Sequence, residues 1–384
     1  MPELWQPLLE RWSSAGLIDA STAERIRNYE SSHEGPKHLR WPVLLAVAFG
    51  AIMLAAGVLL FVSAHWDELS PRGRFSLVLF LVTIFHVAGA VVSERFPALA
   101  TALHGVGTAS CGAGIFLAGQ VFNLQEHWPA GVMLWAIGAW IGWGLRRDWV
   151  QAGLVAVLTP AWLACEWIDR TQRYNWESGR ILSQGLLLFA AAYLTAYFGT
   201  RRGNTRACLA WIGGLALIPC AAASLPEGYT YGSVPDAPAH LIFWGRTLGF
   251  VLPLVLALWL RRKAAWMNVA AALWVVVLIF LPGKSDPLES LLHESLRTLG
   301  PYLWCALASW GLIAWGIKEA RRERINLGIL GFGITLLAFY FSNVMDKLGR
   351  SASLSGLGLV FLVLAWGLER TRRRLVRSVK GASA

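Results

Sequence analysis

The stretch P-V-L-L-A-V-A-F-G-A-I-M-L-A-A-G-V-L-L-F-V-S-A, residues 42–64, contains no charged side chain. A helix needs about 20 apolar residues to cross about 30 Å of hydrocarbon, and this stretch is long enough. It follows a polar segment and is too long and too late for the apolar region of a cleavable signal peptide. Residues 42–64 therefore predict a transmembrane helix.

Further apolar runs of similar length follow, most of them separated by short loops. They cover residues 75–93, 97–119, 129–145, 149–168, 181–199, 207–224, 242–260, 264–282, 301–317, 325–344 and 351–368. The runs lack the alternation of barrel strands, and only helices or closed barrels satisfy the backbone in lipid. The sequence predicts an all-α polytopic transmembrane bundle of about twelve spans over residues 42–368, with neighbouring spans antiparallel.

The overall composition supports this class. Apolar residues make up 56% of the 384, charged residues make up 15%, and the mean hydropathy is +0.50. A soluble chain averages about 45–50% apolar and about 25% charged residues. This excludes a soluble globular protein, and a disordered chain needs the opposite bias.

The net charge of +11 is best explained by the loops. With the N-terminus in the cytoplasm, 24 of the 34 Lys and Arg residues fall on the cytoplasmic side, including those of the tail at 369–384, and 9 fall outside. Cytoplasmic loops carry such an excess. We therefore expect a bacterial inner-membrane protein with both termini cytoplasmic, in contact with the lipid bilayer and not with nucleic acid.

Several inward-running spans end in an aromatic residue and a basic cluster. These ends lie at 143–147, 197–202, 258–262, 315–322 and 366–374. One interpretation is a duplicated hairpin. The other is that interfacial aromatic and basic residues are typical of every inward helix end.

Residues 1–34 resemble a small soluble unit. An apolar face predicts a first helix, Ala15-Gly16 ends it, and Ser21 with Glu24 has the spacing of a capping box that opens a second helix with Ile26 and Tyr29 inward. The face of the first helix consists of Leu4, Trp5, Leu8, Leu9 and Trp12. Two such short helices cannot bury a core alone, so we expect this cytoplasmic hairpin to pack on the bundle, on a second copy or on a partner protein. Residues 35–41 serve as a linker.

Two loops on the outer side carry helix signals. Ser70-Pro71 predicts the cap and first residue of the following helix. Residues 286–299 begin with Asp286-Pro287 and continue with a stripe of leucines opposed by polar residues, which predicts an amphipathic helix in the outer interface.

No catalytic signature is present, so the sequence leaves it uncertain whether the protein is an enzyme. The chain lacks G-x-S-x-G, H-E-x-x-H, a Walker loop and paired metal-binding cysteines. The five cysteines lie in or near apolar runs and are expected to be buried thiols. The sequence indicates no cofactor and no metal.

Polar groups in or near the spans are the remaining clue, because they are costly in lipid and tend to face a pathway. We expect one candidate polar pocket at the outer face. Its residues are Trp66, Asp67, His104, Gln120, Asn123, His127, Arg246 and Asp346. His86 and His104 are predicted to lie at matching depth in adjacent spans, where a hydrogen bond between the two helices is favoured over a shared ligand.

The same regions resemble a family of predicted bacterial membrane proteins named for an N-terminal domain of unknown function, number 2157. Four segments carry the resemblance: Trp12 to Ile26, F-V-S-A-H-W-D at 61–67, G-A-G-I-F-L-A-G-Q-V-F-N-L at 112–124, and the end from Tyr340 through the last span to Arg374. His65 and Phe122 depart from the Asn and Tyr usual in that family. The resemblance implies a polytopic inner-membrane protein and supplies no activity.

Three functional hypotheses follow. The first is a transporter or exporter of a small polar or amphipathic solute. The second is a sensor, scaffold or assembly factor that binds a partner through residues 1–34. The third is an outer-leaflet lipid-modifying enzyme that uses His65, Asp67, Glu126 and His127.

Overall fold

The computed structural model describes residues 6–33, 70–121, 127–172, 177–197, 203–225, 237–280 and 291–343, with a few isolated positions among 49–60 and residue 358. These residues form helices and no strands, which confirms the predicted all-α class. The chain divides into two compact units, Met1–Ser110 and Cys111–Ala384, which are described separately.

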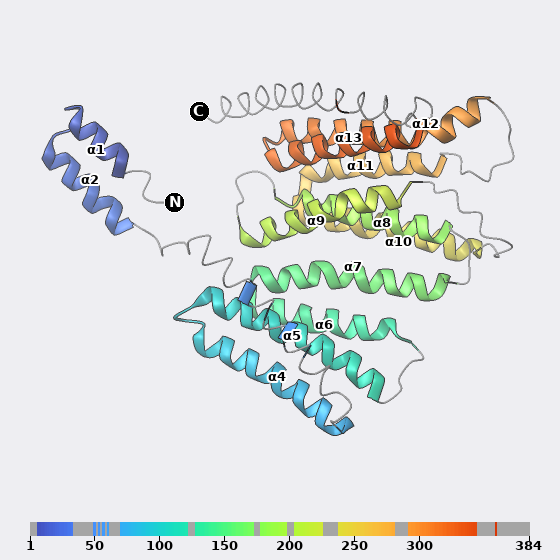
Figure 1. Ribbon diagram of the computed structural model, residues 1–384, viewed down its shortest axis with the longest axis horizontal. Helices are drawn as coiled ribbons and strands as arrows, with labels where there is room; N and C mark the ends of the chain where they lie inside the picture. The colour runs from blue at the N-terminus through green and yellow to red at the C-terminus, as the bar shows by residue number, and fades with distance from the viewer. Residues whose placement is uncertain are drawn as a thin grey trace. The chain divides into compact units, whose positions relative to one another are not determined.

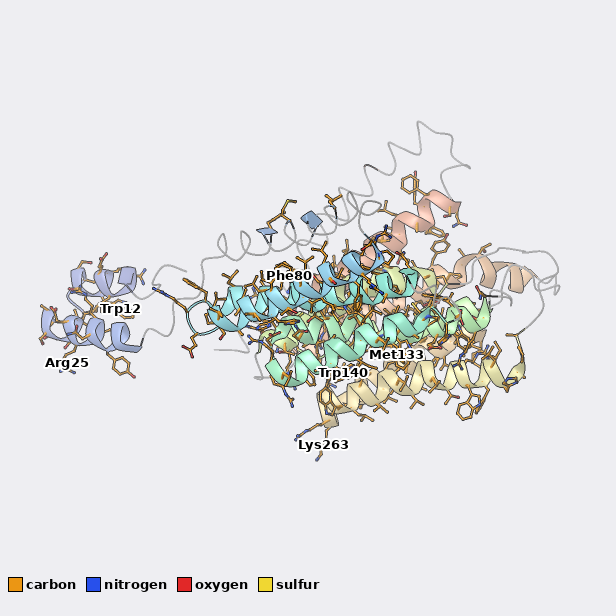
Figure 2. The ribbon with its side chains drawn as sticks, turned by 90° about the horizontal axis from the view of Figure 1, so that it is seen from below. Trp12, Arg25, Phe80, Met133, Trp140 and Lys263 are labelled. Carbon is orange, nitrogen blue, oxygen red and sulfur yellow. The ribbon has the colours of Figure 1, made fainter. Side chains whose placement is uncertain are left out.

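The first unit begins with a helical hairpin (Figure 1), and Trp12 and Arg25 mark its two helices in Figure 2. Helix α1 spans Gln6–Ser14 and packs on α2, which spans Ala20–His33. Leu9 and Ala23 are buried, and Gly16, with φ +68°, lies in the turn. The predicted break at Ala15-Gly16 is therefore confirmed.

Two details of the hairpin differ from the prediction. Helix α2 begins one residue before Ser21, and the Ser21 hydroxyl donates to the Asp19 carboxylate, so Asp19 occupies the cap position. Tyr29 is 61% exposed and not inward. A nine-residue α1 is about 13 Å long and can cover only the first nine residues of α2, and Tyr29 is the tenth.

Helices α4 (Pro71–Val92) and α5 (Pro97–Val121) follow in the chain, at the predicted spans 75–93 and 97–119. Ser70 caps α4, because its Oγ accepts a hydrogen bond of 3.2 Å from the Gly73 N–H, and Pro71 is the first helical residue. This confirms the predicted start. The boundary between the two units falls within α5.

The second unit continues with helices that lie side by side (Figure 1). Each one occurs at a predicted span between 129–145 and 325–344. They are α6 (Pro129–Arg146), α7 (Trp149–Thr171), α8 (Glu177–Leu194), α9 (Asn204–Ala223), α10 (Ala239–Arg261), α11 (Trp266–Val276), α12 (Leu291–Lys318) and α13 (Arg322–Asn343), with 3-10 segments η1 (Arg262–Ala265) and η2 (Val277–Phe280) around α11. The predicted spans 42–64 and 351–368 lie largely outside the described residues.

Contacts along α8 establish the direction of α10 and α11. Gly185 faces Gly249 in the middle of α8, and Arg261 bonds to the Thr195 carbonyl just past the end of α8, so α10 runs parallel to α8. Asn268 bonds to Thr195, whereas Arg180 bonds to the Leu278 carbonyl, so α11 runs antiparallel to both. The chain therefore reverses at Arg262, whose φ is +52°.

Close contacts of glycine fix the other neighbours. A Cβ on Gly213 of α9 would lie 2.3 Å from the Leu194 nitrogen of α8, and a Cβ on Gly328 of α13 would lie 2.8 Å from the Ser309 carbonyl oxygen of α12. Glycine is required at such approaches because any side chain would push the helices apart. Each of these pairs is antiparallel, as the prediction of alternating spans requires.

The predicted amphipathic helix at 286–299 takes a different form. Residues 286–290 lie outside the described part of the chain, and Leu291–Lys318 is one continuous helix that joins the leucine-rich segment to the predicted span 301–317. Pro301 lies inside this helix. A proline removes one backbone hydrogen bond, and buried helices tolerate this loss, so the helix continues where the sequence suggested a boundary.

Among the described residues, six helical segments are long and apolar enough to cross a membrane. They are Pro71–Val92, Pro97–Gln120, Trp149–Thr171, Asn204–Ala223, Ala239–Phe280 and Arg322–Asn343. The 42-residue segment Ala239–Phe280 contains the reversal at Arg262, so its two halves run in opposite directions. The fold is thus a membrane-type helical bundle.

One end of the second unit is rich in cations, and we refer to it as the basic end. Here α6, α8, α10 and α12 end, and α7, α9, α11 and α13 begin. Its cationic residues are Arg146, Arg147, Arg206, Arg261, Arg262, Lys263, Lys318, Arg321, Arg322 and Arg324. Lys263 projects away from its helix there (Figure 2).

Candidate functional site

Several residues of the predicted polar pocket cannot be placed. Trp66, Asp67, Asn123 and Asp346 lie outside the described residues. Gln120 lies in the last turn of α5. Arg246 is half-buried in the second turn of α10, which begins at Ala239, three residues before the predicted span. Convergence of these residues stays a prediction.

His104 lies in the first unit and contacts the neighbouring helix. Its Nδ1 lies 2.9 Å from Nδ1 of His86, so one imidazole donates a hydrogen bond and the other accepts it. Each ring packs over a glycine of the opposite helix, His104 over Gly89 and His86 over Gly107. The predicted matching depth and the hydrogen bond between the helices are confirmed.

His127 belongs to an acidic cluster at the end of the second unit opposite the basic end. Its Nε2 lies 3.0 Å from Oε1 of Glu166, and its Nδ1 lies 3.7 Å from Oδ2 of Asp169. The Trp162 indole N–H donates to the same Glu166 oxygen at 3.2 Å. His127 is thus paired with acids of α7 that were not among the predicted pocket residues.

The strongest polar constellation lies at the basic end, and we call it the Glu319 network. Glu319, just after α12, accepts hydrogen bonds from Arg261 of α10, from Arg324 of α13 at 2.5 Å and from the Trp315 indole at 2.7 Å. The side chains of Arg261 and Arg324 are 0% and 1% exposed. One carboxylate therefore holds two fully buried guanidinium groups.

The two arginines also bond to the end of α8. Arg261 donates to the Thr195 carbonyl at 3.0 Å, and Arg324 donates to the Tyr197 carbonyl at 3.0 Å. The last carbonyls of a helix have no partner within the helix, and cations near them are favourable. Helix α8 ends at Leu194, before the predicted limit at residue 199, and both bonds lie directly beyond that end.

A second layer of contacts supports the network. The Asn268 amide donates to the Thr195 hydroxyl at 2.9 Å, and that hydroxyl donates to the Ala191 carbonyl at 2.7 Å. The guanidinium carbons of Arg261 and Arg324 lie 5.3 and 5.5 Å from the centre of the Trp315 ring, within the range of cation–π attraction. The Glu319 network and these contacts thereby join α8, α10, α11, α12 and α13.

The electrostatics keep Glu319 ionised. Burial alone would raise the pKa of its carboxyl group, but the charge of Arg324 and the three hydrogen bonds outweigh burial and lower the pKa below its ordinary value. One negative and two positive charges leave the Glu319 network with a net charge of about +1. Arg321, 4.1 Å from the centre of the Tyr197 ring, adds a further cation nearby.

A large apolar cavity lies beside the Glu319 network, between α8, α9 and α11 on one side and α12 and α13 on the other. Its volume is about 630 Å³, within the range of small-molecule sites. Trp266, Trp274, Trp304 and Trp315 contribute to its walls. The Thr335 hydroxyl in its wall bonds to its own helix, so the cavity presents almost only apolar surface.

Trp315 connects the cavity to the Glu319 network. One side of the cavity is formed by its ring, which also lies near both guanidinium groups, while its N–H bonds to Glu319. At the edge of the cavity, the Lys318 ammonium lies 4.4 Å from the centre of the Trp266 ring, and both residues are exposed. An apolar chamber therefore ends beside a cluster of cations.

The pocket predicted from the sequence lies at the outer face and not at the Glu319 network. In the sequence, 197–202, 258–262 and 315–322 have the pattern of interfacial helix ends, and the apolar spans that form the cavity carry no signal of a site. The available signal was Glu319, an acid in the otherwise basic run K-E-A-R-R (318–322). A lone acid among cations near lipid needs partners, and here the partners are buried arginines.

Comparison with known proteins finds a similarity to one family over part of the chain. Residues 10–151 match a family described as predicted membrane protein (DUF2157), which confirms the resemblance drawn from the sequence over that range. The description of that family agrees with the six described helices that are long and apolar enough to cross a membrane, and it gives no molecular function. No match was found among curated proteins or among solved structures. The Glu319 network and the cavity lie beyond the matched residues.

Proposed function

We propose that the protein is a transporter or exporter of a small amphipathic solute, and that the cavity beside Trp315 is its binding site. The observation that carries this proposal is the cavity of about 630 Å³ between two groups of helices, bordered at one end by the Glu319 network. Its apolar walls suit the apolar part of an amphipathic solute better than a fully polar solute.

The Glu319 network acts, in this proposal, as a gate at the cytoplasmic end of the cavity. It links α10, the end of α12 and α13, and each link is a hydrogen bond between side chains that can break and re-form. Alternating access requires one group of helices to move against another around a fixed site. The α12–α13 pair, which contributes Trp315 and Arg324, is the group proposed to move.

The proposed topology has twelve spans in a bacterial inner membrane, with both termini and the basic end in the cytoplasm. The gathering of basic residues at one end of the second unit supports this orientation. Cysteines placed at Lys263 and His127 in a cysteine-free chain test it. Lys263→Cys should react with an impermeant maleimide from the cytoplasmic side alone, and His127→Cys from the outside alone; the reverse pattern would contradict the orientation.

Cys305 lines the cavity and supplies a native probe of transport. In a chain that keeps only this cysteine, an impermeant maleimide should label it in both right-side-out and inside-out vesicles. A chain that keeps only Cys208, whose sulfur lies against Gly153 between α9 and α7, is the matched control and should stay unlabelled. Labelling of Cys305 from one side only, or from neither, would refute alternating access.

A second candidate function is partner binding by the N-terminal hairpin. Leu17 is 73% exposed and Tyr29 is 61% exposed, and such apolar side chains on a small soluble unit favour an interaction surface. Deleting residues 1–34 tests it. Cross-linked complexes in the membrane should then disappear while the labelling of Cys305 stays the same, and unchanged cross-linking would contradict the idea.

A further inference from the structure

We infer that the cavity is a site for anionic lipids of the cytoplasmic leaflet, with the acyl chain between the helices and the headgroup at Lys318. This inference deepens the proposed function, because it names the class of solute. It concerns binding, so it can be tested separately from transport.

The first argument is the shape and chemistry of the cavity. Along α12 its lining extends from Trp315 at the basic end to Tyr302, a stretch of helix about 20 Å long. An apolar space of about 630 Å³ can hold a hydrocarbon chain, whose transfer from water to an apolar site is favourable by about 0.8 kcal/mol per methylene group.

The second argument is the charge at one end of this space. Lys318 lies on Trp266 at the edge of the cavity, and both side chains are exposed. Arg321 and the Glu319 network, with its net positive charge, lie at the same end. Basic pockets between helices on the cytoplasmic side bind anionic lipid headgroups. A chain in the cavity therefore places its headgroup among cations, and a phosphate or a carboxylate is favoured over a zwitterion.

The third argument excludes the buried arginines as the direct contact. Arg261 and Arg324 are fully buried, and both bond to Glu319 and to carbonyl groups at the end of α8. Their positive charge contributes to the electrostatic potential at this end of the cavity, whereas Lys318 is exposed beside the cavity wall and can contact a headgroup directly. Trp266 beside it suits the interface between chain and headgroup, because tryptophan favours the boundary of apolar and polar regions.

Binding to the delipidated full-length protein, measured by native mass spectrometry, tests the inference. The probes are oleoyl-lysophosphatidylglycerol, its zwitterionic choline counterpart and glycerol phosphate. The anionic lipid should bind about fivefold more tightly than the zwitterionic lipid, the factor expected for one basic residue near a headgroup, and Lys318→Gln should remove this preference. Arg322→Gln is the matched control, because Arg322 is exposed at the same end, whereas Lys318 lies on the ring of Trp266 in the cavity wall, and the control should leave the preference unchanged.

A separate variant tests whether the acyl chain occupies the cavity. Ala308→Trp fills the cavity, because Ala308 lines it, and should weaken binding of both lipids more than tenfold. If that variant fails to fold, protection of Cys305 from alkylation by the anionic lipid in the otherwise native protein is the second measurement.

Any one of four results would overturn the inference. They are equal binding of the two lipids, an equal effect of Lys318→Gln and Arg322→Gln, unchanged binding by Ala308→Trp, and binding of glycerol phosphate as tight as that of the lipid. Lipid binding combined with one-sided labelling of Cys305 would refute transport and leave the lipid site intact. Labelling of Cys305 from both sides without a lipid preference would support transport and refute the lipid site.

Discussion

Replacing Glu319 by glutamine should be more damaging than removing either of its arginine partners. The carboxylate is the single acid that bridges the buried guanidinium groups of Arg261 and Arg324. Glu319→Gln leaves two like charges buried side by side. Arg324→Gln leaves one acid with one arginine, which is a balanced pair.

The expected losses of stability follow from the burial of the two arginine side chains. Removing one partner of a buried ion pair costs about 3–5 kcal/mol, because the remaining charge is uncompensated. The side chains left by Glu319→Gln are 0% and 1% exposed, so that full range applies. Arg324→Gln instead loses hydrogen bonds to Glu319 and to the Tyr197 carbonyl, a cost of about 1–3 kcal/mol.

Thermal unfolding of the purified protein, followed by tryptophan fluorescence, is the assay. At about 2–4 °C per kcal/mol, Glu319→Gln should lower the midpoint by about 6–20 °C. Glu323→Gln is the matched control, because Glu323 is an exposed acid at the same end and its replacement should cost less than about 0.5 kcal/mol. The double variant Glu319→Gln/Arg324→Gln should be less damaged than the sum of its parts, with a coupling of about 0.5–3 kcal/mol. Equal midpoints for the two glutamate variants, or a larger loss for Arg324→Gln alone, would refute the reasoning.

Three other predictions concern helix packing and the hairpin. Gly213→Ala should lower the unfolding midpoint, because its Cβ would meet the α8 backbone at 2.3 Å. Gly214→Ala, whose nearest contact is 3.8 Å, should not lower it, and equal midpoints would show that α8 and α9 approach less closely. Gly107→Ala should cost about 1–3 kcal/mol of stability by displacing the His86 ring from His104. Gly119→Ala in the same helix, with open space around it, should be tolerated, and a loss of stability in both variants would point to the helix backbone instead of the histidine contact. Asp19 should titrate with a pKa of about 2, below its ordinary 3.8, because the Ser21 and Thr22 side chains bond to its carboxylate, so its contribution to hairpin stability is complete above pH 3.8 and is lost as the pH falls toward 2. An NMR titration of the full chain measures this, and an unchanged pKa in Ser21→Ala would contradict the assigned cause.

The helices themselves were largely predictable, because an uncharged run of about 20 residues has few alternatives to a helix in lipid. The cap at Ser70 and the His86–His104 contact were also predictable, since both depend on local spacing and on depth along adjacent helices. The continuation of α12 through Pro301 was not, because the cost of a proline in a helix depends on what packs around it.

The candidate site was missed because its parts lie far apart in the chain. Arg261 meets the carbonyl of Thr195, 66 positions away, and Arg324 meets Tyr197, 127 positions away. No periodicity within a span predicts which spans become neighbours. The cavity likewise depends on the spacing of five helices, which their apolar sequences do not encode individually.

The ends of α6 and α10 show why a sequence pattern was insufficient. W-G-L-R-R at 143–147 and L-W-L-R-R at 258–262 both end a helix, and in both the second arginine adopts a positive φ, 55° at Arg147 and 52° at Arg262. The first arginines differ: Arg146 bonds to Asp148, two residues away, while Arg261 is buried against Glu319 of another helix.

The two helix ends share a positive φ but differ in ψ, which is 21° at Arg147 and −124° at Arg262, and the partners of the first arginines differ as well. A duplicated hairpin would explain the shared sequence pattern without explaining the buried arginine. The acid at position 319 joins this helix end to an internal network, so this position, more than the basic residues around it, distinguishes the end of α10 from the end of α6.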